Sequence, residues 1–149
     1  MDRGIYLLLM LYACNKEPIE GTLKLQKLMF LLEKELIEKG KRLTSDFYYY
    51  VPYRLGPMSI DVYDEIETLT QYKLVDTRRI GEKTVYKLTD KGERLVRNVL
   101  KDNVLVAKIL KEIEALKKKF NAMSDKELLR YVYSRYPMYA IRSEIKSLF

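Results

Sequence analysis

The chain has 149 residues, of which 48% are apolar and 33% charged, which indicates one folded domain with an extension and argues against disorder. It has one cysteine and no histidine, so an internal disulfide is excluded and the commonest general base and zinc ligand are missing. The net charge of +7 suggests an anionic partner. The sequence therefore predicts a cytoplasmic protein that is not an enzyme and holds no metal or cofactor.

Two helices are predicted at the start of the chain. Residues 5–13 form an apolar run that is too short to span a membrane and predicts a buried first helix. Leucines recur at helical spacing over residues 23–39 and predict a longer central helix. Lys24 and Lys27 lie three residues apart on this helix, so they can meet phosphate groups near its start. A solvated basic face is an equally good interpretation of the two lysines.

An aromatic run follows the central helix. Phe47 to Val51 favours extended backbone and predicts a strand beside a later hairpin. The tyrosines of this run, and Tyr53 after it, fit a core and its rim better than a platform for stacking nucleic-acid bases. Gly56 and Pro57 then break the chain, and Ser59 is placed to cap a helix that runs to about Tyr72.

A hairpin and a further helix are predicted after residue 72. Residues 74–79 and 84–88 are short runs rich in β-branched and aromatic side chains, which is typical of strands. Between them lies a four-residue turn in which Gly81 is available for a positive φ. Thr89 is placed to cap the helix that follows. The order of helix, basic-tipped hairpin and capped helix is that of a winged helix.

Three motifs between residues 25 and 57 resemble those of a known group of proteins. Leu25-Gln26-Lys27-Leu28, the aromatic run Phe47 to Tyr50 and the Gly56-Pro57 turn occur in the same order in winged-helix proteins of the mostly archaeal YwgA-like group. The chain is more distantly similar to the Panacea (SocA-like) antitoxin domain. The resemblance covers most of residues 20–95 and implies a winged-helix fold. Abundant Lys, Glu, Tyr and Ile with only two Gln is also typical of proteins from hot environments.

The predicted helix over residues 59–72 is acidic. Asp61, Asp64, Glu65 and Glu67 are clustered carboxylates, but ligands from one exposed helix seldom enclose a metal ion, and the helix dipole is a sufficient reason for the first two. The same carboxylates oppose entry into the major groove of DNA. DNA contacts are therefore expected mainly from the hairpin, through phosphates and the minor groove.

The C-terminal third predicts a helical extension. Apolar residues recur at alternating spacings of four and three from Leu95 to Phe120, with one polar interruption at Asp102, which is typical of a coiled-coil seam and predicts a homodimer. The alternative is that the last helices fold back over this seam. The predicted dimer interface consists of Val106, Ile109, Ile113, Leu116 and Phe120.

Two short helices around Pro137 end the extension. Ser124 and Glu127 form a capping box for a helix from about Asp125 to Arg135, and a last helix is predicted from Tyr139 to Leu148. Basic and aromatic side chains alternate here and can bind single strands, although packing explains them more simply.

Together these patterns predict a mainly α protein with a small β-hairpin. A winged helix-turn-helix domain spans residues 1–97, and the helical extension spans residues 98–149. The predicted function is a DNA-binding transcriptional regulator, and the alternative is an antitoxin-like or adaptor module that binds a protein partner through the acidic helix 59–72. The predicted DNA-binding residues are Arg78, Arg79, Lys83, Arg54, Lys24 and Lys27.

Overall fold

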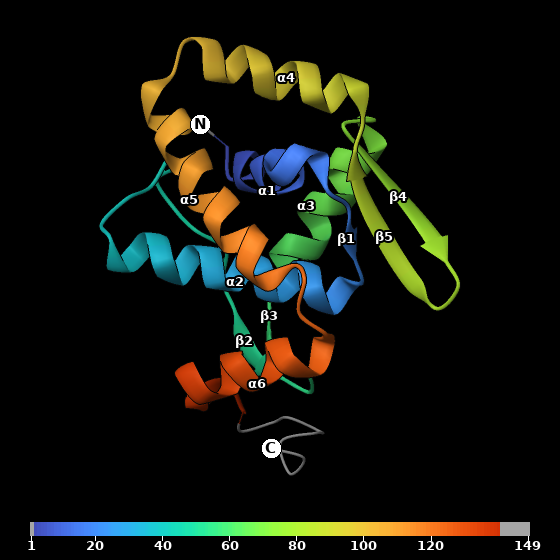
Figure 1. The fold of residues 1–149 in the computed structure, drawn as a ribbon, viewed down its shortest axis with the longest axis vertical. Coiled ribbons are helices and arrows are strands. Elements are labelled where there is room, and N and C mark those ends of the chain that lie inside the picture. The colour runs from blue at the N-terminus through green and yellow to red at the C-terminus, as the bar shows by residue number, and fades with distance from the viewer. Residues whose placement is uncertain (1, 141–149) are drawn as a thin grey trace.

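The computed structural model describes residues 2–140 as a mainly helical fold with two small antiparallel sheets. Figure 1 shows α1 (Gly4–Lys16) in the middle of the molecule, between α4 (Asp90–Lys101) and α2 (Thr22–Glu38). Helix α5 (Val104–Phe120) packs along α1. A single hydrophobic core, with members from Ile5 to Tyr133, connects these helices.

Helix α1 is buried on nearly all sides, as its apolar run predicts. It ends in a left-handed turn, in which residues 14–16 have φ angles of 57°, 56° and 59°. The fully buried Lys117 of α5 donates hydrogen bonds to the carbonyl oxygens of Ala13 (2.8 Å) and Glu17 (2.7 Å), on either side of this turn. The predicted central helix is also present, as α2.

The larger sheet has the strand order β1-β5-β4. Strands β4 (Val75–Ile80) and β5 (Lys83–Leu88) form the predicted hairpin, in register from Val75 opposite Leu88 to Ile80 opposite Lys83. Gly81 adopts φ +64° in the turn between them. The third strand is β1 (Ile19–Glu20), which pairs with β5.

The aromatic run is therefore not the strand beside the hairpin. Residues 47–50 lie outside any strand, and Val51–Tyr53 forms β2, which pairs with β3 (Gly56–Met58) in a separate hairpin. Tyr50 is buried beside α2 and η1 (Pro137–Ala140), whereas Tyr48 is buried beside α2 with Arg3 over its ring. The prediction that these tyrosines belong mainly to the core is thus confirmed for two of them.

The local signals around α3 (Ile60–Gln71) are confirmed in detail. The Ser59 hydroxyl accepts a hydrogen bond from the Val62 amide and caps the helix. Gln26 of α2 donates to the Ser59 carbonyl and accepts from its amide, both at 2.9 Å. Thr89 caps α4 in the same manner as Ser59 caps α3. The start of α3 is therefore fixed both by its own cap and by α2.

The predicted coiled-coil seam is interrupted. The chain leaves the helix at Asp102, and Asn103 caps the new helix α5. The expected domain boundary at residue 97 lies within α4, and α5 shares the core with α1 and α2. All five predicted dimer-interface residues lie inside this core: Val106, Ile109, Ile113, Leu116 and Phe120.

The end of the described chain crosses the β2–β3 hairpin. Helix α6 (Asp125–Arg135) begins with the predicted capping box of Ser124 and Glu127, and Pro137 begins the short 3-10 helix η1. Contacts join α6 to α2 and η1 to β2. Residues 141–148 of the predicted last helix lie outside the described residues.

Candidate functional site

The two predicted phosphate-binding lysines of α2 are buried. The Lys24 ammonium donates hydrogen bonds to the carbonyl oxygens of Asn121 (3.0 Å) and Met123 (2.6 Å), between α5 and α6. The Lys27 ammonium donates to the Pro57 carbonyl in β3 at 2.9 Å. Both side chains are less than 10% exposed. Backbone carbonyls from distant segments hold the two ammonium groups inside the fold, so this geometry gives no support to phosphate contacts, which stay a prediction.

The predicted hairpin cations lie on the surface, as expected, and two of them have acidic neighbours. The Arg78 guanidinium lies 2.8 Å from Asp76 on the same strand, and the Lys83 ammonium lies 3.7 Å from Asp125 of α6. Arg79 is exposed. Asp76 and Asp125 reduce the positive charge that these residues can offer to DNA.

Arg54 lies apart from these cations, in the turn between β2 and β3. Its guanidinium carbon is 5.9 Å from the centre of the Tyr53 ring. Lys27 and Arg54 both line a pocket between α2 and the β2–β3 hairpin, Lys24 lies in the interior beside α5 and α6, and the other three predicted DNA-binding residues lie on the β4–β5 hairpin. The six residues do not form one continuous basic surface.

Helix α3 presents carboxylates on its outer surface. Asp64 and Glu67 are exposed, while Asp61 lies 3.6 Å from Arg3. Glu65 accepts a hydrogen bond from the Tyr48 hydroxyl at 3.4 Å, and burial raises its pKa above the usual value. These charges are unfavourable next to DNA phosphates and favourable next to a basic protein surface.

A groove with an apolar floor runs between α1, α3 and α4. It consists of two adjoining hollows of about 340 and 450 Å³ that share Leu95 and Val99 of α4. Tyr72, at the end of α3, is 65% exposed and stands at its side. We call this site the α3/α4 groove, and its apolar residues are Ile5, Leu8, Leu69, Tyr72, Leu74, Leu95 and Val99.

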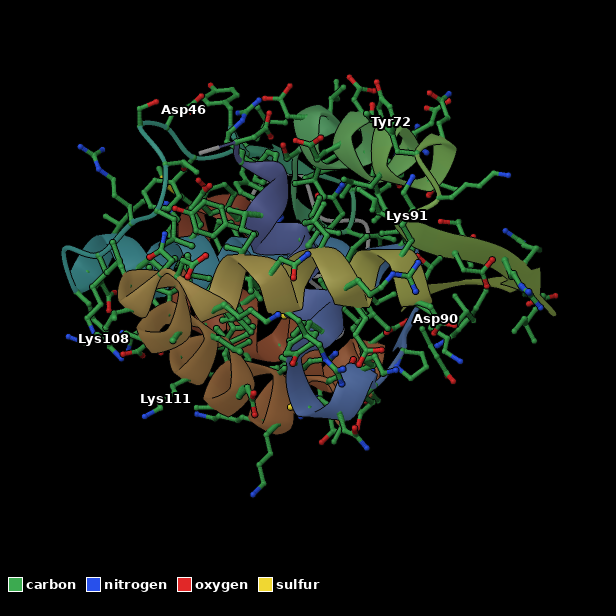
Figure 2. The ribbon with its side chains drawn as sticks, turned by 90° about the horizontal axis from the view of Figure 1, so that it is seen from above. Asp46, Tyr72, Asp90, Lys91, Lys108 and Lys111 are labelled. Carbon is green, nitrogen blue, oxygen red and sulfur yellow. The ribbon has the colours of Figure 1, made fainter. Side chains whose placement is uncertain are left out.

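The two edges of the α3/α4 groove carry opposite charges. Asp2 and Glu65 lie at the α3 edge, whereas Lys91 and Arg94 lie at the α4 edge. The Lys91 ammonium donates to the Tyr72 carbonyl at 3.0 Å, so α4 is tied to the end of α3. Figure 2 looks down on α4, with Tyr72 and Lys91 labelled where α3 ends and α4 begins.

Sequence reasoning missed this groove because it assigned Leu95 and Val99 to a coiled-coil seam. A signal was present in the pairs Leu95-Val96 and Val99-Leu100, which give α4 two apolar faces. Val96 is buried in the core, whereas Leu95 is 38% exposed. The second face thus remains at the surface of the chain.

Two buried titratable groups on α2 have shifted pKa values. Burial lowers the pKa of Lys27 to about 7, and Asp125 acts in the opposite direction. Burial raises the pKa of Glu33 to about 8, although the carboxylate accepts a hydrogen bond from the Tyr48 amide.

Within residues 2–140, no three His, Cys, Asp or Glu side chains gather in a way that could hold a metal ion. No helix in this range is long and apolar enough to cross a membrane.

A known protein family matches most of the chain. The family of antitoxin SocA-like Panacea domains matches residues 25–137, which is 113 of the 149 residues. This range begins in α2 and ends just after α6, so it includes α3, α4 and the central part of the core. No curated protein matches the chain. The narrower resemblance to the archaeal YwgA-like group stays a prediction.

Proposed function

Because the chain belongs to the family of antitoxin SocA-like Panacea domains, we propose that it is an antitoxin-like module that binds a protein partner in the α3/α4 groove. The observation that carries this proposal is the groove itself, with its apolar floor and its oppositely charged edges. Exposed apolar surface rimmed by charge is typical of protein interaction sites.

The groove fits a particular kind of partner segment. An amphipathic helix or strand can place apolar side chains on Leu95, Val99 and Tyr72. Its basic residues would lie toward Asp2 and Glu65, and its acidic residues toward Lys91 and Arg94. The apolar contacts would supply most of the affinity, and the charges would fix the direction of the segment.

The same features disfavour the DNA-binding regulator. The order of α3, the β4–β5 hairpin and α4 supports a winged-helix relationship, but α3 carries carboxylates where a reading helix carries Arg, Lys, Asn or Gln. Lys24 and Lys27 are occupied inside the fold. We infer that the chain keeps a winged-helix scaffold but that its α3 helix does not read DNA bases.

Site-specific photocrosslinking in cells tests the proposal. A photoreactive residue at position 72 is expected to capture a partner protein that the same residue at position 111, exposed on α5, does not capture. The captured partner, once purified, should bind at least tenfold more weakly to Leu95→Asp, because a charge would face the apolar floor.

Leu105→Asp is the matched control, since Leu105 is also exposed but lies outside the groove. It should bind the partner as the unaltered protein does. Equal capture from positions 72 and 111, or equal weakening by the two Leu→Asp changes, would overturn the proposal.

A further inference from the structure

Strand β4 is an edge of the larger sheet. The strand order β1-β5-β4 leaves one side of β4 without a neighbouring strand in the part of the chain that the structure describes. Residues 77–80 are exposed, and β4 lies along the outer side of the projecting hairpin (Figure 1). A strand edge of this kind can pair with a strand of another chain.

Backbone hydrogen bonds show which residues of β4 point outward. Bonded and non-bonded residue pairs alternate along an antiparallel ladder. The Thr89 amide donates to the Leu74 carbonyl at 3.1 Å, one step beyond the last pair of the β4–β5 register. The even-numbered residues of β4 therefore bond to β5, whereas residues 75, 77 and 79 turn their N–H and C=O groups away from it. The other side of β5 agrees, because the Thr84 carbonyl accepts from the Gly21 amide next to β1 (2.8 Å) and so points away from β4.

This alternation limits how a second copy of β4 can pair with the first. The outward residues of the two copies must face each other, because only they have free backbone groups at this edge. The antiparallel pairing that uses all three sets Thr77 opposite the second copy's Thr77, and Val75 opposite the second copy's Arg79. A two-fold axis then passes between the two threonines, as an isologous dimer requires.

The same register places opposite charges together. Asp76 and Arg78 lie on one face of β4, where Arg78 Nε is 2.8 Å from Asp76 Oδ2. In the two-fold pairing, Asp76 is opposite the second copy's Arg78, and Arg78 is opposite the second copy's Asp76. These are non-bonded pairs, in which opposing side chains are closest. The four charges therefore alternate in sign around the centre of the interface.

Both side chains keep groups for a second partner. The ion pair within the chain uses Nε and Oδ2, which leaves the terminal NH₂ groups of Arg78 and Oδ1 of Asp76. The two side chains are 72% and 39% exposed, so a second chain can reach them. The neighbouring registers that also match outward residues would set Asp76 opposite Asp76, or Arg78 opposite Arg78, and like charges in opposition are unfavourable.

From this complementarity we infer that β4 pairs antiparallel with β4 of a second copy of the chain, so that the two sheets join into one across a two-fold axis. This interface differs from the buried seam of α5 and from the α3/α4 groove. It therefore goes beyond the proposed function and does not depend on it. Because one short strand from each chain supplies the contact, the dimer is a weak and reversible one.

Sedimentation velocity of the full chain tests the interface. The unaltered protein should show a monomer–dimer equilibrium with a Kd below about 200 μM. Asp76→Arg and Arg78→Asp should each weaken it at least about fivefold, because each change sets like charges opposite each other at two symmetric positions. The double variant Asp76→Arg/Arg78→Asp should dimerise as the unaltered protein does. An equal mixture of the two single variants should form a heterodimer, because opposite charges face each other again.

Lys111→Asp is the matched control, because Lys111 is exposed on α5 and the change in charge equals that of Arg78→Asp. It should leave the equilibrium unchanged. The inference is overturned if the unaltered protein stays monomeric up to about 500 μM, a concentration well above the expected Kd. It is also overturned if the single charge reversals dimerise as Lys111→Asp does, or if the double variant does not recover.

Disulfide trapping tests the register. Asp76→Cys and Arg78→Cys are made separately in a Cys14→Ser background, which removes the free cysteine of the natural chain. Positions 76 and 78 of different copies are directly opposite, whereas two copies of either position are only diagonal neighbours. A mixture of the two variants should therefore form disulfide-linked dimers faster than either variant alone. Equal rates in the three samples would overturn the two-fold pairing.

Discussion

Helix α2 and the β4–β5 hairpin are both rich in cations, and they place them in opposite environments. On α2, Lys24 and Lys27 turn inward and donate to carbonyl oxygens of the α5–α6 turn and of β3. On the hairpin, Arg78 and Arg79 stay at the surface. The difference is one of geometry, since α2 has neighbours on most sides whereas the hairpin projects from the body of the molecule (Figure 1).

Positive charge in a sequence therefore does not by itself indicate a binding surface. A buried lysine that bonds to carbonyls joins segments of the chain together, and its removal leaves those carbonyls without a donor. An exposed arginine beside an aspartate contributes little to stability. The two regions should therefore respond very differently to the same change.

The largest expected effect is that of Lys24→Met. It removes two hydrogen bonds from a charged donor to the carbonyls of Asn121 and Met123, so we expect a loss of about 2 to 3 kcal/mol in the free energy of unfolding. Arg79→Met on the exposed hairpin should change this free energy by less than about 0.5 kcal/mol. Urea unfolding of both variants measures the difference. Equal losses would show that the contrast between the two regions is wrong.

A second prediction concerns the pH dependence of stability that Glu33 of α2 causes. The folded pKa of Glu33, about 8, exceeds the unfolded value of 4.5, so its contribution to stability is complete below pH 4.5 and is lost as the pH rises through about 8. Between pH 5 and 7, the free energy of unfolding should therefore decline by an amount on the order of 2 kcal/mol, and Glu33→Gln should remove this decline because glutamine does not titrate. The amide oxygen of glutamine can still accept the hydrogen bond from the Tyr48 backbone.

The interval from pH 5 to 7 isolates Glu33 from the buried lysines. Lys27 and Lys117 have folded pKa values lowered to about 7 and 8, so their effects fall mainly above this range and have the opposite sign. Urea unfolding at pH 5, 6 and 7 gives the slope of the unfolding free energy against pH. If this slope is the same in Glu33→Gln as in the unaltered protein, Glu33 does not cause the decline in stability.

The smallest effect on stability is expected at the hairpin, where the test is DNA binding. Replacing Arg78, Arg79 and Lys83 together by Ala should leave the fold intact. If these residues contact phosphates, the slope of log affinity against log salt should fall by up to about three units, almost equally for all duplex sequences. The protein-interaction proposal expects negligible duplex binding by the unaltered protein at physiological salt, and fluorescence anisotropy decides between the two.

The parts of the fold that follow from neighbouring residues could be predicted. The caps Ser59 and Thr89, the capping box at Ser124 and the β4–β5 hairpin depend on residues within a few positions of one another. Strand β1 was missed because it has two residues and owes its existence to pairing with β5, more than sixty positions away. Short strands of this kind leave almost no local pattern.

The candidate site was harder to predict because it depends on which segment packs against each apolar face of a helix. The periodicity of α5 was read correctly as an apolar stripe, but a stripe does not say whether α1 or a second chain packs against it. Ile113 is completely buried within one chain. The carbonyl partners of Lys24 lie 97 and 99 positions along the chain and that of Lys27 lies 30 positions along it, beyond any local pattern. A homodimer stays a prediction, without support from this seam.

The left-handed turn at the end of α1 has a consequence for the order of folding. Residues with side chains seldom adopt this conformation, and it costs roughly 1 to 2 kcal/mol for each of them. Here the turn is held by Lys117, about a hundred positions later, so closing it requires a long loop to form first. We expect the turn to form after the transition state. Lys117→Met should therefore speed unfolding and leave the refolding rate nearly unchanged in stopped-flow measurements.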